Sequence, residues 1–245
     1  MLDLLAVAAA GAAAGASNSL AGAGSLISFP TLVALGVPPL SANVTSTIGL
    51  VPGAVGGSIA YADLLTEQRA RLAAPMLLGA VAGTALLLIT SNDTFEAIVP
   101  GLIAASCLLL LFQPHLMPRI SHAGNEHSPF LSLGLVLSGA YAAYFGTAVG
   151  ILLLGLLALF VIDSMQHLNA IKILLAGIAN LLAAVVYAFL ATVNWRYAVC
   201  LMVSSLIGGR LGAKFARRIS GDLLRVAIAL IGLVVAGVLA VRAFA

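Results

Sequence analysis

Charge is the property that this sequence has least of. Only 8% of its 245 residues are charged and 62% are hydrophobic, whereas soluble globular proteins contain about 25% charged residues. Such a chain cannot cover a water-facing surface, which excludes an ordinary soluble domain and predicts the lipid bilayer as a partner. The basic residues form no stripe interleaved with aromatic residues, so we expect no nucleic-acid partner.

Cysteine and metal-binding side chains are also scarce. Cys107 and Cys200 lie alone in apolar runs, with no cysteine or histidine at ligand spacing, which argues against a disulfide framework and a thiolate metal site. The histidines show no convergent arrangement that would hold a metal. The sequence also lacks the Gly-x-x-x-x-Gly-Lys-Ser/Thr loop that binds ATP phosphates. We therefore expect neither a metal nor a cofactor.

Acidic residues are missing from the middle of the apolar stretches. All eight carboxylates fall near the ends of these stretches. An intramembrane enzyme needs a nucleophile beside a base, or metal ligands, within the membrane. Because no such set occurs in the apolar stretches, the sequence predicts a protein that is not an enzyme.

The apolar residues form eight stretches, over residues 2–36, 40–62, 72–90, 95–113, 130–162, 167–192, 197–213 and 223–244. Six of them approach the length of about 20 residues that crosses a bilayer as a helix. The first and the fifth are too long, because a straight helix of either would reach about 50 Å, against a hydrocarbon core of about 30 Å. We expect each to break, the first from Gly15–Ser19 to Gly22–Gly24 and the second across Gly139–Thr147. Each broken stretch could form either a re-entrant pair of helices or two short helices that fully cross the membrane.

The basic residues between these stretches predict a topology. Cytoplasmic loops are enriched in lysine and arginine. The basic loops share one side only if the long stretch 130–162 contributes an even number of crossings. Applying the same rule to residues 2–36 places both termini outside. The inner side then holds Arg69, Arg71, Arg119, Lys214, Arg217, Arg218 and Arg225, and the outer side Arg196 and Arg242.

This topology makes the two halves of the chain inverted relative to each other. Several residues recur at one constant spacing in both halves, as in the pairs Gly24 with Gly150, Asn43 with Asn169 and Gly83 with Gly209. The expected fold is an all-α polytopic membrane protein with two inverted-topology repeats, each made of a pair of short broken helices and three full transmembrane helices. The repeats span 1–113 and 130–245, and the polar segment 114–129 is a cytoplasmic linker.

Inverted halves with broken helices at matching positions indicate a secondary transporter whose site lies between the repeats. Glycines that only permit close helix packing are the alternative for any single position.

The chain also resembles a known family in several short segments. The resemblance rests on the runs Gly15–Gly24, Ser25–Pro30, Leu35–Pro39, Ala42–Ser46, Asn169–Lys172 and Gly208–Arg218. These are similar to the glycine-rich and Ala-x-x-Thr-Ser signatures of the TauE/SafE sulfite exporter family, also called TSUP. The resemblance covers nearly the whole chain and implies export of sulfite, thiosulfate, a small organosulfonate or a related anion, without ATP hydrolysis.

A small anion that enters the membrane needs hydrogen-bond donors and positive potential in place of water. Helix N-termini at the two breaks supply both, and nearby hydroxyl and amide groups complete the candidate site. In the first half the candidates are Asn18, Gly22, Gly24, Ser25, Asn43, Thr45 and Ser46. In the second half they are Tyr141, Tyr144, Gly146, Thr147, Asn169, Lys172 and Asn180.

Lys172 is the leading candidate among them. It lies within the stretch 167–192, where an unpaired cation costs about 2.5 to 3.5 kcal/mol on insertion scales. Its ammonium group either faces an anion site, snorkels to the membrane interface, or pairs with Asp163.

The sequence thus predicts a multi-pass protein of the inner or plasma membrane that carries a small anion by alternating access, and the resemblance implies that this anion contains sulfur. An anion channel for the same substrates and a non-transporting membrane subunit are the alternatives. A monomer and a homo-oligomer both fit.

Overall fold

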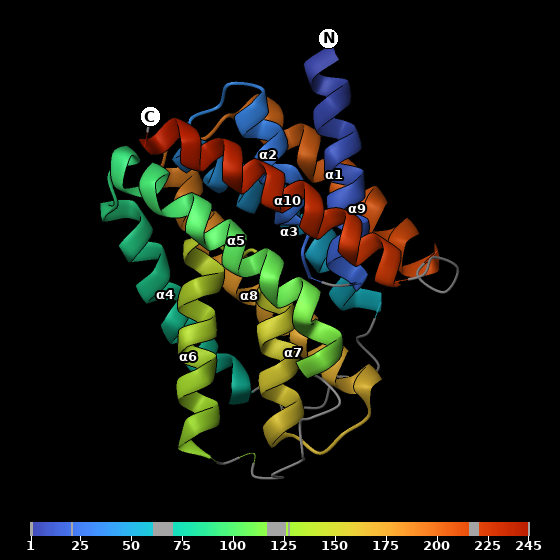
Figure 1. The fold of residues 1–245 in the computed structure, drawn as a ribbon. Helices are drawn as coiled ribbons and strands as arrows, with labels where there is room; N and C mark the ends of the chain where they lie inside the picture. The colour runs from blue at the N-terminus through green and yellow to red at the C-terminus, as the bar shows by residue number, and fades with distance from the viewer. Residues whose placement is uncertain are drawn as a thin grey trace.

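The computed structural model of the chain describes residues 2–20, 22–60, 71–116, 126, 128–215 and 221–244. Within these residues the regular structure consists of helices and contains no strand (Figure 1). The helices are α1 (Leu2–Leu20), α2 (Ser25–Ala34), α3 (Pro39–Ala60), α4 (Ala73–Ile89), α5 (Asn92–Leu116), α6 (Pro129–Tyr144), α7 (Val149–Phe160), α8 (Met165–Leu190), α9 (Trp195–Phe215) and α10 (Gly221–Phe244).

The two apolar stretches that are too long for one crossing each divide into two helices. The first becomes α1 and α2, which are separated by a short segment with Gly22 at φ +68°. The second becomes α6 and α7, with Gly146 at φ +69° and Ala148 at φ +59° between them. Positive φ values of this kind suit glycine and are rare for alanine. They reverse the backbone locally and end each helix inside its apolar stretch.

The breaks begin later than the sequence analysis expects. Helix α1 continues through Gly15 and Ser19, and α6 continues through Gly139. Both glycines allow close helix packing instead, because a side chain at Gly15 would overlap the carbonyl of Ser205 in α9 and one at Gly139 would overlap the carbonyl of Met76 in α4. Only the later parts of the expected segments, at Gly22–Gly24 and around Gly146, lie between helices.

The helices pack in a regular set of pairs. Helix α1 packs on α9 and α4 packs on α6, while α3 contacts α9 and α4 contacts α8. Helices α5 and α10 run alongside each other across the front of the view in Figure 1. Helices α3 and α8 contact each other and bring the two halves of the chain together. The buried core draws on both halves, with large side chains such as Phe29, Phe95 and Tyr187 fully enclosed.

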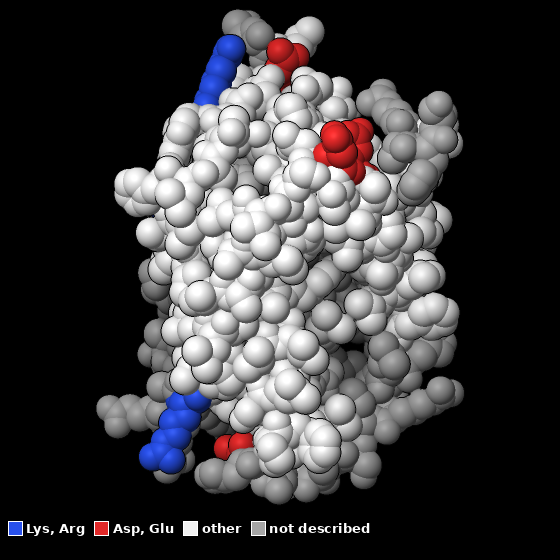
Figure 2. Space-filling model, turned by 90° about the vertical axis from the view of Figure 1, so that its left-hand side faces the viewer, with Lys and Arg blue, Asp and Glu red and all other residues white. Residues whose placement is uncertain are grey.

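The outer surface is apolar over a broad belt. Large hydrophobic side chains are exposed on several helices, among them Leu78, Phe130, Leu137, Phe189 and Val234. On the face drawn in Figure 2, the described charged side chains lie toward the two ends and the middle carries none. Helices α5 and α8 contain apolar segments long enough to cross a membrane, over Asn92–Phe112 and Gln166–Leu190, and shorter apolar helices accompany them. A surface of this kind suits lipid.

Several sequence predictions concern the polar segments between the helices, and the structure does not test them. Most of the linker 114–129 lies outside the described residues, although α5 extends to Leu116 and α6 begins at Pro129. The side chains of further basic residues are likewise outside the described part, namely Arg69, Arg119, Lys214, Arg217, Arg218, Arg225 and Arg242.

Candidate functional site

A cavity lies where the two breaks meet helices α3 and α8. Its volume is about 700 Å³ when the space at its open mouth is included. The first half of the chain lines it with Asn18, Gly22, Ser25, Thr47, Leu50, Gly53 and Ala54. The second half lines it with Phe145, Gly146, Val149, Gly150, Lys172, Ile173, Ala176, Gly177 and Asn180.

The two breaks touch each other at the wall of this cavity. A Cβ atom on Gly22 would lie 2.8 Å from the Cα atom of Gly150 at the start of α7. Any side chain at Gly22 would therefore push the two segments apart. Beside this contact, the hydroxyl of Ser25 donates a hydrogen bond of 3.3 Å to the hydroxyl oxygen of Thr147. The backbones of both halves thus approach closely where the site is formed.

Asn18 fixes the first break and also presents donors. Its side-chain oxygen Oδ1 accepts a 2.8 Å hydrogen bond from the backbone N–H of Gly24. A side-chain amide has one oxygen acceptor and one nitrogen that carries two donors. The oxygen is engaged by Gly24, and the NH₂ group of this cavity-lining residue, which has no acceptor among the described residues, can donate to a bound molecule.

Lys172 is the charged residue of the cavity wall. It is only 2% exposed, and no hydrogen bond or ion pair joins its ammonium group to another residue in the part of the chain that the structure describes. No carboxylate is present among the lining residues. A buried cation without a counterion is costly in a membrane, so the cavity favours an anion.

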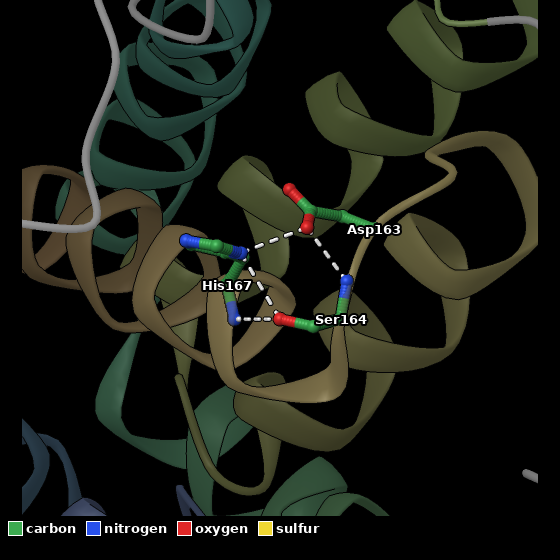
Figure 3. Close-up of polar contacts among 3 residues, drawn as sticks. All are labelled: Asp163, Ser164 and His167. Atoms are coloured by element: carbon green, nitrogen blue, oxygen red, sulfur yellow. Dashed lines mark hydrogen bonds and ion pairs between the residues drawn. The ribbon is translucent and has the colours of Figure 1, made fainter.

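Asp163, the alternative partner for Lys172, is engaged elsewhere. It lies in the connection between α7 and α8, where its Oδ1 is 2.8 Å from Nδ1 of His167 (Figure 3). The same oxygen accepts a 2.6 Å hydrogen bond from the backbone N–H of Ser164. The Ser164 hydroxyl in turn accepts from the backbone N–H of His167 and caps the start of α8. This cluster anchors the end of the helix that carries Lys172.

The family described as sulfite exporter TauE/SafE matches residues 7–239. The chain belongs to this family. One relative is a Sinorhizobium protein named "Probable membrane transporter protein ORF9", which is 28% identical over 83% of this chain and 79% of its own length. A Haemophilus influenzae protein named "Probable membrane transporter protein" is 26% identical over 91% of this chain and 89% of its own.

A third relative is the Escherichia coli K12 protein named "Probable membrane transporter protein YfcA", which is 23% identical over 90% of this chain and 83% of its own length. Family membership, together with the apolar belt, identifies the TauE/SafE chain as a membrane-embedded protein of a transporter family.

In this family member, the structure brings only part of the sequence-predicted set to the cavity. The predicted residues that line it are Asn18, Gly22, Ser25, Gly146, Lys172 and Asn180. The predicted residues outside the lining are Gly24, Asn43, Thr45, Ser46, Tyr141, Tyr144, Thr147 and Asn169.

Several of the residues outside the lining hold the surrounding helices together. The Asn43 side chain donates a 2.9 Å hydrogen bond to the carbonyl of Tyr144. Thr45 accepts one of 3.0 Å from the backbone N–H of Asn194, and the Ser46 hydroxyl lies 2.6 Å from that of Ser28. These groups satisfy one another between helices.

Sequence reasoning missed most of the apolar wall. Ile173, Ala176 and Gly177 share the face of α8 with Lys172, and Thr47 and Leu50 form the matching part of α3. Helical spacing from Lys172 toward the C-terminus was the available signal, because residues three or four apart lie on one face. This spacing identifies Ala176 and Asn180, which follow Lys172 on α8. Asn169 precedes Lys172 by one turn and does not line the cavity.

Proposed function

We propose that this protein is a secondary transporter that exports a small sulfur-containing anion, such as sulfite, thiosulfate or a small organosulfonate. The observation that carries the proposal is the buried ammonium group of Lys172, which has no partner among the described residues, in a cavity whose described lining holds no carboxylate. An isolated cation in a membrane costs about 2.5 to 3.5 kcal/mol on insertion scales, and a bound anion offsets that cost. The family name supports the choice of a sulfur oxyanion.

The remaining polar groups of the cavity complement Lys172. The NH₂ group of Asn18 is a donor on the first half, and Gly150 lies in the first turn of α7, at the positive end of its helix dipole. Leu50, Phe145 and Val149 contribute an apolar part of the wall. A small anion with an oxygen-rich head suits this division between a polar and an apolar side.

The packing of the helices supports two inverted repeats, 1–113 and 130–245. If α1 to α5 correspond in order to α6 to α10, the contact of α1 with α9 matches that of α6 with α4, and α3 with α9 matches α8 with α4. The contact of α2 with α10 likewise matches that of α7 with α5, while α3–α8 and α5–α10 pair each helix with its own counterpart. This pattern supports a two-fold axis through the cavity.

Alternating access follows from a site between two such halves. The lining is shared between α1 to α3 and α6 to α8, so a rocking movement of one half against the other would open the cavity first to one side and then to the other. The proposed setting is the inner or plasma membrane, with several crossings, both termini outside and the linker 114–129 in the cytoplasm.

Ligand-dependent melting of the purified protein tests the substrate class, because a ligand that binds only the folded state stabilises it. Sulfite, thiosulfate and sulfoacetate are compared with sulfate and with carboxylates of matched size. We expect at least one of the first three to raise the melting temperature in a saturable way. Stabilisation by carboxylates alone would contradict the proposed substrate.

A further inference from the structure

The break between α6 and α7 is held in place by two hydroxyl groups that do not line the cavity. The Tyr141 hydroxyl donates a 2.7 Å hydrogen bond to the carbonyl oxygen of Thr147, and the hydroxyl of Ser106 lies 2.7 Å from that of Tyr141. Ser106 belongs to α5 and Tyr141 to the last turn of α6. We call Ser106, Tyr141 and the Thr147 carbonyl the break latch.

Ser106 and Thr147 of the break latch are buried, Tyr141 is partly exposed, and the hydrogen bonds among them form a chain. Ser106 and Thr147 are 0% and 1% exposed. Each hydroxyl has one proton, and one arrangement uses both: Ser106 donates to Tyr141, and Tyr141 donates to Thr147. Ser106 also lies 3.3 Å from the Thr147 carbonyl and 2.7 Å from the carbonyl of Leu102 in its own helix. Helix α5 thereby fixes a peptide that belongs to the other half of the chain.

The peptide that the latch holds precedes a strained residue. Ala148 has φ +59° and ψ 14°, a left-handed conformation that costs an alanine roughly 1 to 2 kcal/mol. No side chain caps α7 at this position. The first N–H groups of α7 thus have no side-chain acceptor, and the bonds to the Thr147 carbonyl act on the peptide just before this uncapped helix start.

The latch also decides which way this peptide faces. In a trans peptide the carbonyl and the following N–H point in opposite directions. The Thr147 carbonyl, which carries partial negative charge, is turned toward α5, and α5 contributes no residue to the cavity lining. On either side of this peptide, Gly146, Val149 and Gly150 do line the cavity. The buried Lys172 shares that wall and has no partner among the described residues.

We infer that Tyr141 and Ser106 are positioning residues for anion binding: they hold the left-handed break, and with it the start of α7, in the orientation that the site needs. This inference rests on the proposed function. It assigns a role in the site to α5, a helix outside the cavity lining, which is packed against α7 and against α10 (Figure 1).

The matched control for Tyr141 is Tyr187. The Tyr187 hydroxyl is also buried and donates a 2.8 Å hydrogen bond to a backbone carbonyl, that of Ala143 in α6. Tyr187→Phe thus removes the same kind of bond from the same protein interior without touching the break. Any loss of anion affinity or of exchange protection that is larger in Tyr141→Phe than in Tyr187→Phe is therefore caused by the loss of the latch.

The first readout is anion affinity, measured by the shift in melting temperature over a range of sulfite and sulfoacetate concentrations. We expect Tyr141→Phe to weaken binding about five- to tenfold, the equivalent of one hydrogen bond, and Tyr187→Phe to leave affinity unchanged. Ser106→Ala has a smaller effect than Tyr141→Phe. The double variant binds more weakly than Tyr141→Phe alone, because Ser106 lies 3.3 Å from the Thr147 carbonyl and can donate to it directly when the Tyr141 hydroxyl is absent.

The second readout is amide hydrogen exchange at residues 146–150 in the protein without anion. We expect faster exchange there in Tyr141→Phe than in Tyr187→Phe. If amide exchange at residues 146–150 is the same in Tyr141→Phe as in Tyr187→Phe, the latch does not hold the break, whether or not the wild-type protein binds an anion. If exchange is faster in Tyr141→Phe but its anion affinity is unchanged, the latch has no role in the site. If the wild-type protein binds none of the sulfur anions, the proposed function fails, and exchange alone then judges the latch.

Discussion

At the scale of single residues, the chemistry of the site depends on Lys172. Its long side chain is buried in α8 at the cavity wall, and its charge has no compensating group among the described residues. The empty protein therefore bears an electrostatic cost that ligand binding removes. The ammonium nitrogen of Lys172 therefore affects both the stability of the protein and its affinity for an anion. Removing its charge should raise the stability and lower the affinity.

Replacing Lys172 with methionine keeps the shape of the side chain and removes the charge. Without anion, we expect Lys172→Met to be more stable than the wild-type protein by about 1 to 3 kcal/mol. With sulfite or sulfoacetate, it should show no rise in melting temperature. Arg196→Ala is the control, since this exposed basic residue of α9 lies outside the cavity. A Lys172→Met protein that keeps the ligand-induced shift removes Lys172 from the site.

The candidate site residues differ in how well they could be predicted from the sequence. Lys172 could be predicted because a lone cation in an apolar stretch needs a specific explanation. Asn43, Thr45 and Ser46 were predicted by the same logic, but neutral polar groups in helices also bond between helices, and that is where the structure places them. The apolar wall around Phe145 could not be predicted, because apolar residues dominate the whole chain.

At the scale of elements, the two breaks form the site, and their glycines are not interchangeable. Gly22 has φ +68° and lies against the backbone of Gly150, whereas Gly36, at the turn after α2, has φ +84° with open space around its Cβ position. Both positions need a left-handed backbone, but only Gly22 also needs the absence of a side chain.

The pair Gly22→Ala and Gly36→Ala separates these two requirements. Gly36→Ala should cost about 1 to 2 kcal/mol of stability, the price of a left-handed alanine, with unchanged anion affinity. Gly22→Ala should cost more and weaken binding about tenfold, because the two breaks must move apart. Melting curves with and without sulfite measure both quantities. Equal behaviour of the two variants contradicts a contact between the breaks that matters for binding.

The breaks were predictable in number, but in position only in their later parts, at Gly22–Gly24 and around Gly146. Length alone required that residues 2–36 and 130–162 divide. Glycine-rich sequence could not distinguish Gly15 and Gly139, which pack against other helices, from Gly22 and Gly146, which turn the chain. Close helix packing and a left-handed turn both require the absence of a side chain. Which of the two applies at a given glycine depends on the helix packed against it.

At the scale of the whole molecule, the apolar belt and the paired helices support inverted halves in a membrane. The proposed topology places the N-terminus outside and the linker inside. In a variant without Cys107 and Cys200, the substitutions Leu2→Cys and Glu126→Cys report the two sides. A membrane-impermeant thiol reagent should label the first in intact cells and the second only after the membrane is opened. Labelling of both from one side contradicts an odd number of crossings in the first half.

Counterflow in liposomes that contain only the purified protein tests the central claim, which is carrier-type anion transport through the Lys172 cavity. Liposomes loaded with unlabelled sulfite or sulfoacetate are diluted into a trace of the labelled anion. The account predicts saturable uptake that is accelerated by the internal anion and is absent with Lys172→Met. Non-saturable flux without acceleration, or the same counterflow in Lys172→Met, would contradict it.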